Sequence, residues 1–170
     1  MSINELKIKH SKKYLWLYIV VLILLVTFMT MAEFLAHYYI FLGFGILFSI
    51  PIIYMIIDAL LFQVQISGSH FNVRTWYGRE YEFNCSDIEM VDFIRMRSRY
   101  GPYFFIDIKT SSEKLQIRNH VIGFDDMIEY ILTKYQTGSI KPQAMSQKTQ
   151  DFLLKYKNGE VFKGVGMFRS

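Results

Sequence analysis

Two long apolar stretches occupy most of the first 62 residues of the chain. Residues 14–32 carry no formal charge, and these 19 residues form about 28 Å of α-helix at 1.5 Å per residue. Residues 39–62 are apolar apart from Asp58, and their glycines and single proline are tolerated in membrane helices. Each stretch can cross the hydrocarbon core of a bilayer, so the pattern predicts two transmembrane helices.

The first stretch also resembles the start of a secretory signal, because lysines precede it. The apolar core of such a signal usually has roughly 7–15 residues and ends at a small-residue cleavage site. The longer core found here favours a retained helix. Only residues 33–38 separate the two stretches, so we expect a tight helical hairpin.

The positions of basic residues predict the orientation of this hairpin. Four lysines precede the first stretch, Lys and Arg are abundant after the second, and residues 33–38 contain neither. The positive-inside rule then puts both termini in the cytoplasm, with residues 1–13 as a basic cytoplasmic segment of a multi-pass protein of the cell (inner) membrane. The residues expected at the membrane interface are Lys12, Lys13, Tyr14, Trp16 and Asp58.

Asp58 allows two interpretations. An acid close to the end of a membrane helix can lie at the cytoplasmic interface, paired with Lys12 or Lys13 across the hairpin. Alternatively, a carboxylate in a span can mark an ion or proton pathway of a transporter or enzyme component. No further acid continues such a path, so the interfacial position is preferred.

After residue 62 the pattern changes to short runs in which apolar and polar residues alternate, as in β-strands. A phase slip at Val91 and Asp92 suggests a bulge. The period then changes, and apolar residues at helical spacing predict an amphipathic helix over residues 124–135, with Asp125 and Asp126 in its first turn. The expected strands are 64–67, 71–77, 80–84, 88–97, 103–109 and 114–118.

The segments VQISGSHFNVRTWYGREYEF, SDIEMVDFIRM, FFIDIKTSSEKLQI and FDDMIEYILTKY follow one another in the order just described. This succession resembles the bacterial PH-like domains that follow membrane helices, over residues 63–135. The resemblance implies an α-helical transmembrane hairpin plus an α+β domain, a bent antiparallel β-barrel capped by a C-terminal helix. It also implies a binding role, because PH-like domains dock lipids, peptides or proteins.

Residues 136–170 read as a polar linker followed by a basic and apolar tail. Residues 146–157 favour a helix that ends at Asn158-Gly159. The alternative is a β-hairpin with Asn-Gly as its turn.

Binding residues are expected around the longest predicted strand. Arg95, Arg97 and Arg99 recur with period two, so an extended strand points all three to one side. Such a stripe suits lipid phosphates or an acidic partner, although an ordinary solvated face has the same pattern. Tyr100 and Tyr103 flank a Gly-Pro turn that can protrude and contact a membrane or partner, or simply pack.

Charge and chemistry narrow the functions further. The formal charge of +4 comes from the basic flanks and not from residues 63–135, which argues against nucleic acid. The single cysteine, Cys85, is expected to be a small buried or half-buried residue and not a nucleophile. Phosphate-binding loops, nucleophile motifs and metal-ligand spacings are absent from the sequence, so we expect no catalytic residue, cofactor or metal, and no enzyme.

These observations predict a non-enzymatic binding module tethered to the cytoplasmic face of the membrane. Its partners are the lipid bilayer and a protein of unknown identity, with anionic lipid headgroups as the other ligand class. The alternative is a small regulatory or immunity-type membrane protein that inhibits a specific partner.

Overall fold

The structure is a computed structural model, and it describes residues 5–36, 40–98 and 101–160. Contacts within the chain form two compact units. The first is made of Met1–Ile8, Val64–Asn72 and Tyr81–Ser170, and the second of Lys9–Gln63 and Val73–Glu80. The second unit therefore contains both apolar helices together with one short hairpin turn.

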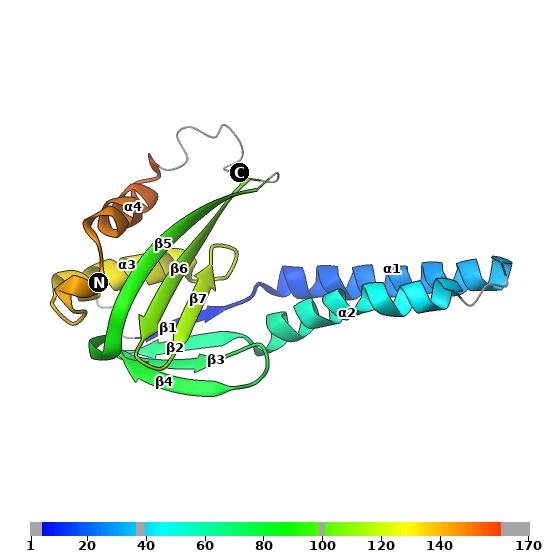
Figure 1. Cartoon of the computed structure of the whole chain (residues 1–170), viewed down its shortest axis with the longest axis horizontal. Helices are drawn as coiled ribbons and strands as arrows, with labels where there is room; N and C mark the ends of the chain where they lie inside the picture. Colours follow the sequence, from blue (N-terminus) through cyan, green and yellow to red (C-terminus); the bar gives the residue numbers. More distant parts are fainter. Residues whose placement is uncertain (1–4, 37–39, 99–100, 161–170) are drawn as a thin grey trace. The chain divides into compact units, whose positions relative to one another are not determined.

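The two apolar stretches form a helical hairpin of α1 (Lys12–Ala36) and α2 (Ile40–Leu61), which pack side by side (Figure 1). Gly45 allows their close approach, because a Cβ added there would lie 3.1 Å from the side chain of Met29. Most of their described large apolar side chains are exposed, and the others are half-buried. Two exposed apolar helices of this length are consistent with a two-span membrane anchor.

A four-stranded sheet begins before the hairpin and continues after it. Its spatial order is β1-β2-β3-β4, so β1 and β2 are neighbours although α1 and α2 separate them along the chain. Both ends of the helical hairpin therefore start from one sheet. The strands are β1 (Glu5–Lys9), β2 (Gln63–Ser67), β3 (His70–Arg74) and β4 (Glu80–Asn84).

β1 was not expected, because its lysines suggested only a basic segment. Its residues alternate between exposed and buried, and Leu6 and Ile8 point into the core. β3 is shorter than the predicted strand 71–77, because the chain turns after Arg74. Trp76 and Tyr77 therefore lie in a turn and not in a strand.

A second, three-stranded antiparallel sheet contains β5 (Ile88–Ser98), β6 (Gly101–Thr110) and β7 (Lys114–Arg118). It follows a short 3₁₀ turn, η1 (Cys85–Asp87), and a register shift occurs between Ile88 and Met90, close to the predicted bulge. No pairing between the sheets closes a barrel over the described residues. The observed fold is thus a helical hairpin plus an α+β region of two antiparallel sheets.

Helices complete the first unit. α3 (Phe124–Gln136) buries the apolar face that the sequence predicted. A 3₁₀ turn, η2 (Pro142–Ala144), leads to α4 (Gln147–Lys157), and this confirms the helical interpretation of the tail over the hairpin. The start of α3 is close to β1, since a Cβ at Gly123 would lie 3.0 Å from the carbonyl oxygen of Lys7.

Candidate functional site

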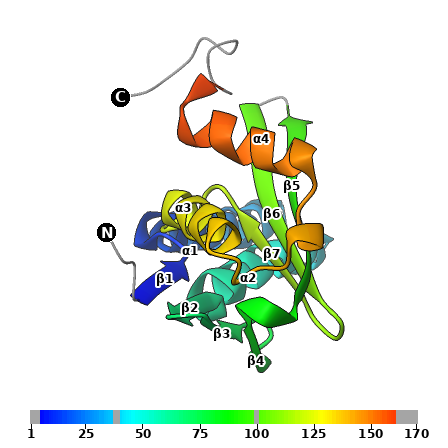
Figure 2. The same ribbon diagram turned by 90° about the vertical axis from the view of Figure 1, so that its left-hand side faces the viewer.

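A surface groove of about 470 Å³ lies between β5 and the first half of α4. Figure 2 shows α4 beside β5. Phe93, Ile94 and Phe152 supply apolar contact area, and polar side chains surround them. The full lining is Asp92, Phe93, Ile94, Arg95, Ser146, Lys148, Thr149 and Phe152.

Specific contacts hold α4 against β5 and so define the groove. Ser146 caps the helix, because its Oγ accepts a hydrogen bond of 3.1 Å from the backbone N–H of Thr149. The Thr149 hydroxyl donates to Asp92 Oδ1 at 3.2 Å. Near the other end of α4, the ring of Tyr156 packs edge-on against Phe93 and Phe104. The groove therefore belongs to a packed arrangement of β5 and α4.

The groove carries excess positive charge. Arg95 and Lys148 line it, and within the described parts of the chain neither forms a salt bridge. The first turn of α4 contains no acidic residue, so its N-terminal dipole adds a positive potential. Asp92 also lines the groove, but its Oδ1 already accepts from Thr149 and from the backbone N–H of Phe93. An acidic group is the ligand that this charge distribution favours.

One edge of β5 lies in the groove. β5 pairs with β6 on one side, and on its other side the described residues provide only an isolated bridge between Val91 and Met145. Beyond this bridge the residues from Asp92 to Arg95 line the groove. An unpaired strand edge presents backbone N–H and C=O groups to which an extended segment can bind.

Of the predicted binding residues, Arg95 is the one that the structure places at the groove. By alternation it shares a face of β5 with Val91 and Phe93, which are buried, so this face runs from the core into the groove. Tyr103 is exposed on β6 opposite Met96. Arg97 belongs to β5, but its side chain is outside the described part, as are residues Arg99 and Tyr100.

The predicted interface residues lie at the start of α1, where Lys12, Lys13, Tyr14 and Trp16 are all exposed. Asp58 is paired, although not with a lysine. Its Oδ2 lies 3.3 Å from Nε2 of His10, whose ring also packs edge-on against Phe62. A neighbouring strand end, and not the basic start of α1, thus supplies the partner of this acid.

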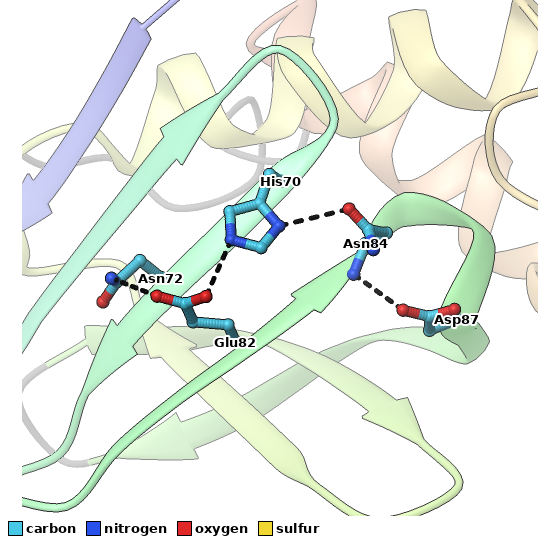
Figure 3. A network of polar contacts seen from close by, with 5 residues as sticks. All are labelled: His70, Asn72, Glu82, Asn84 and Asp87. Carbon is cyan, nitrogen blue, oxygen red and sulfur yellow. Dashed lines mark hydrogen bonds and ion pairs between the residues drawn. The ribbon is translucent and has the colours of Figure 1, made fainter.

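A second polar cluster connects β3 and β4 on an exposed surface (Figure 3). The His70 ring contacts Asn84 Oδ1 through Nδ1 at 3.2 Å and Glu82 Oε2 through Nε2 at 3.1 Å. Asn72 donates to the other oxygen of Glu82 at 2.9 Å. These hydrogen bonds, that of Asn84 first, raise the pKa of His70 above its ordinary value. The cluster connects two strands that are neighbours in the first sheet.

Cys85 is buried, as predicted, and its Sγ lies 3.1 Å from the hydroxyl of Tyr130. Burial raises the pKa of the Cys85 thiol, so the reactive thiolate is disfavoured. The Tyr130 hydroxyl in turn donates to the carbonyl oxygen of Gly68 at 2.9 Å. Within the described ranges, no group of three or more His, Cys, Asp or Glu residues could hold a metal ion.

No family model, curated protein sequence or solved structure matches this chain. The candidate site is therefore defined by its geometry alone.

The sequence analysis did not identify Lys148 and Thr149 as site residues. Thr149 and the Asp92 that it contacts are 57 positions apart in sequence, and no periodic pattern connects them. The one available signal was the polar cap residue Ser146 ahead of an amphipathic run, which located the helix but not the strand it packs against.

Proposed function

We propose that this chain is a non-enzymatic, membrane-anchored binding protein whose groove between β5 and α4 binds an extended acidic segment of a partner protein. The groove itself carries this proposal, because it combines an apolar lining, two cations and an open strand edge. A peptide adds main-chain hydrogen bonds to such an edge, and its side chains occupy the adjoining apolar and basic positions.

A protein ligand is favoured over a lipid headgroup by the shape of the site. Two basic side chains and a helix N-terminus can neutralise one or two carboxylates, and an extended peptide can also pair with both the N–H and the C=O groups of the strand edge, which a phosphate headgroup cannot. The two sheets with a helix after them support a PH-like ancestry for the domain. The basic flanks of the apolar helices support placing the groove at the cytoplasmic face of the membrane.

Photo-crosslinking in native membranes tests the groove. In the test variant, a photoreactive phenylalanine analogue replaces Phe152, which is a conservative change at the groove. In the control variant, the same analogue replaces Ser111, an exposed residue between β6 and β7. We expect protein adducts from position 152 and none of the same mass from position 111. Adducts of equal yield at both positions, or adducts with lipid alone, would contradict a protein-binding groove.

A charge reversal at Lys148 tests the basic lining of the groove, and the same reversal elsewhere on α4 is its control. Lys148→Glu places an acid in the first turn of α4, which the helix dipole tolerates, so loss of adduct would not reflect loss of the helix. We expect capture at position 152 to fall about tenfold or more, since charge-assisted hydrogen bonds contribute about 1.5–3 kcal/mol. Lys155→Glu makes the same charge change on α4 away from the groove, and capture should persist.

A further inference from the structure

The turn between β3 and β4 has aromatic residues where polar residues are usual. Trp76 and Tyr77 occupy it, with exposed fractions of 39% and 54%. Tight turns mostly use Gly, Pro, Asn, Asp and Ser, which fit the backbone and water. Two adjacent large aromatic side chains exposed at a turn indicate a surface that contacts something other than water.

The backbone of this turn does not depend on the two aromatic side chains. The N–H of Thr75 donates to the carbonyl oxygen of Arg79 at 2.9 Å, and the N–H of Gly78 donates to that of Thr75 at 3.0 Å. Gly78 has a φ of +80°, a conformation that glycine adopts without strain. The turn is thus formed by its own hydrogen bonds and presents Trp76 and Tyr77 outward.

The turn contacts an apolar membrane helix. The ring of Trp76 packs on that of Tyr54 in α2, with centroids 4.6 Å apart. Tyr54 is itself exposed and precedes the end of α2 by seven residues, about 10 Å at the rise of a helix. Trp16 follows the start of α1 by four residues, about 6 Å. Both tryptophans are therefore at the depth where amphipathic rings concentrate between headgroups and acyl chains.

We infer that the β3–β4 turn is a third membrane contact of this protein, with Trp76 and Tyr77 inserted in the interfacial layer of the bilayer. The occupant of this surface is lipid, because the turn continues the lipid-facing surface of α2 at Tyr54. The indole and phenol rings each have an apolar body and a polar end, which suits the boundary between water and acyl chains. The inference rests on the insertion of α1 and α2 that the proposed function assumes.

The two tryptophans of the chain allow a direct test. Trp16→Phe leaves Trp76 as the only indole, and Trp76→Phe leaves Trp16 as the only indole. Each full-length variant is reconstituted in phosphatidylethanolamine and phosphatidylglycerol vesicles, with and without lipids brominated high on their acyl chains. Emission maximum and quenching are measured, and iodide in the aqueous phase serves as the opposing quencher.

For the inference to hold, Trp76 must show blue-shifted emission, quenching by brominated lipid and protection from iodide, with Trp16 behaving similarly. If brominated lipid quenches Trp16 while iodide alone quenches Trp76, the helices α1 and α2 are inserted but the β3–β4 turn is not, and the inference is overturned. If brominated lipid quenches neither residue, α1 and α2 are not inserted in the bilayer. That result contradicts both the inference and the proposed function. Slow reaction of the buried Cys85 with a thiol reagent verifies that both variants are folded.

Discussion

At the scale of single residues, His70 is a side chain whose protonation the fold controls. The protonated imidazole can donate to the Asn84 carbonyl oxygen and to Glu82, and both contacts raise its pKa. A raised folded-state pKa means that the charged form stabilises the fold. This stabilisation is fully present below the ordinary pKa of 6.5 and disappears as the pH rises through the raised value.

Removing the Asn84 acceptor is therefore expected to lower the pKa of His70. An NMR titration of the imidazole proton resonances in Asn84→Ala and in the unaltered protein measures the shift. Ser86→Ala alters a nearby exposed side chain that does not contact His70, and should leave the titration unchanged. If the pKa of His70 is the same in Asn84→Ala as in the unaltered protein, the Asn84 carbonyl oxygen does not stabilise the protonated imidazole.

At the scale of elements, β1 contributes more to the domain than its five residues suggest. Ile8 is fully buried, and a Cβ built at Gly123, just before α3, would approach it within 3.4 Å. The strand thus connects the edge of the first sheet to the helix that covers the core. The preceding residue, Lys7, points to the exposed face of the strand and does not pack in the core.

Ile8→Ala is expected to destabilise the domain by about 2–5 kcal/mol, because it leaves a cavity in the core. The buried Cys85, the only cysteine, measures this loss through its rate of reaction with a thiol reagent, which follows the opening of the domain. A loss of 2 kcal/mol accelerates labelling about thirtyfold.

Lys7→Ala serves as the control, since surface substitutions usually change stability by less than about 0.5 kcal/mol. Equal labelling rates for the two variants would mean that β1 does not support the core around Cys85.

Elements with strong local patterns were predicted closely. The strands Glu80–Asn84 and Lys114–Arg118 have the predicted bounds, and α3 extends the predicted helix by one residue. Elements and sites defined by distant contacts were not predicted. The sequence of β1 alone indicates only a basic segment, because its strand structure depends on pairing with the distant β2. The groove likewise depends on the packing of α4 against β5.

At the scale of the whole molecule, the helical hairpin of α1 and α2 is an insertion between two paired strands. β1 and β2 are neighbours in one sheet, while every residue of α1 and α2 lies between them in sequence. The domain therefore needs the residues on both sides of the hairpin. It does not need the hairpin itself to complete its sheet.

Replacing residues 10–62 with a short Gly-Ser linker is expected to give a water-soluble, folded domain that keeps β1. A matched variant that begins at Gln63 lacks β1 and should expose its core. Recovery without detergent and the thiol reactivity of Cys85 distinguish the two outcomes. A variant without β1 that protects Cys85 as well as the linked one would contradict the role of the strand.

The early position of β1 has a consequence for biosynthesis. The ribosome releases this strand before either apolar helix, and its partner β2 emerges after both have been made. If the second helix failed to insert, β1 and β2 would be stranded on opposite sides of the bilayer and the sheet could not form. In a chain whose two apolar helices span a membrane, the sheet can therefore form only after both helices have been inserted.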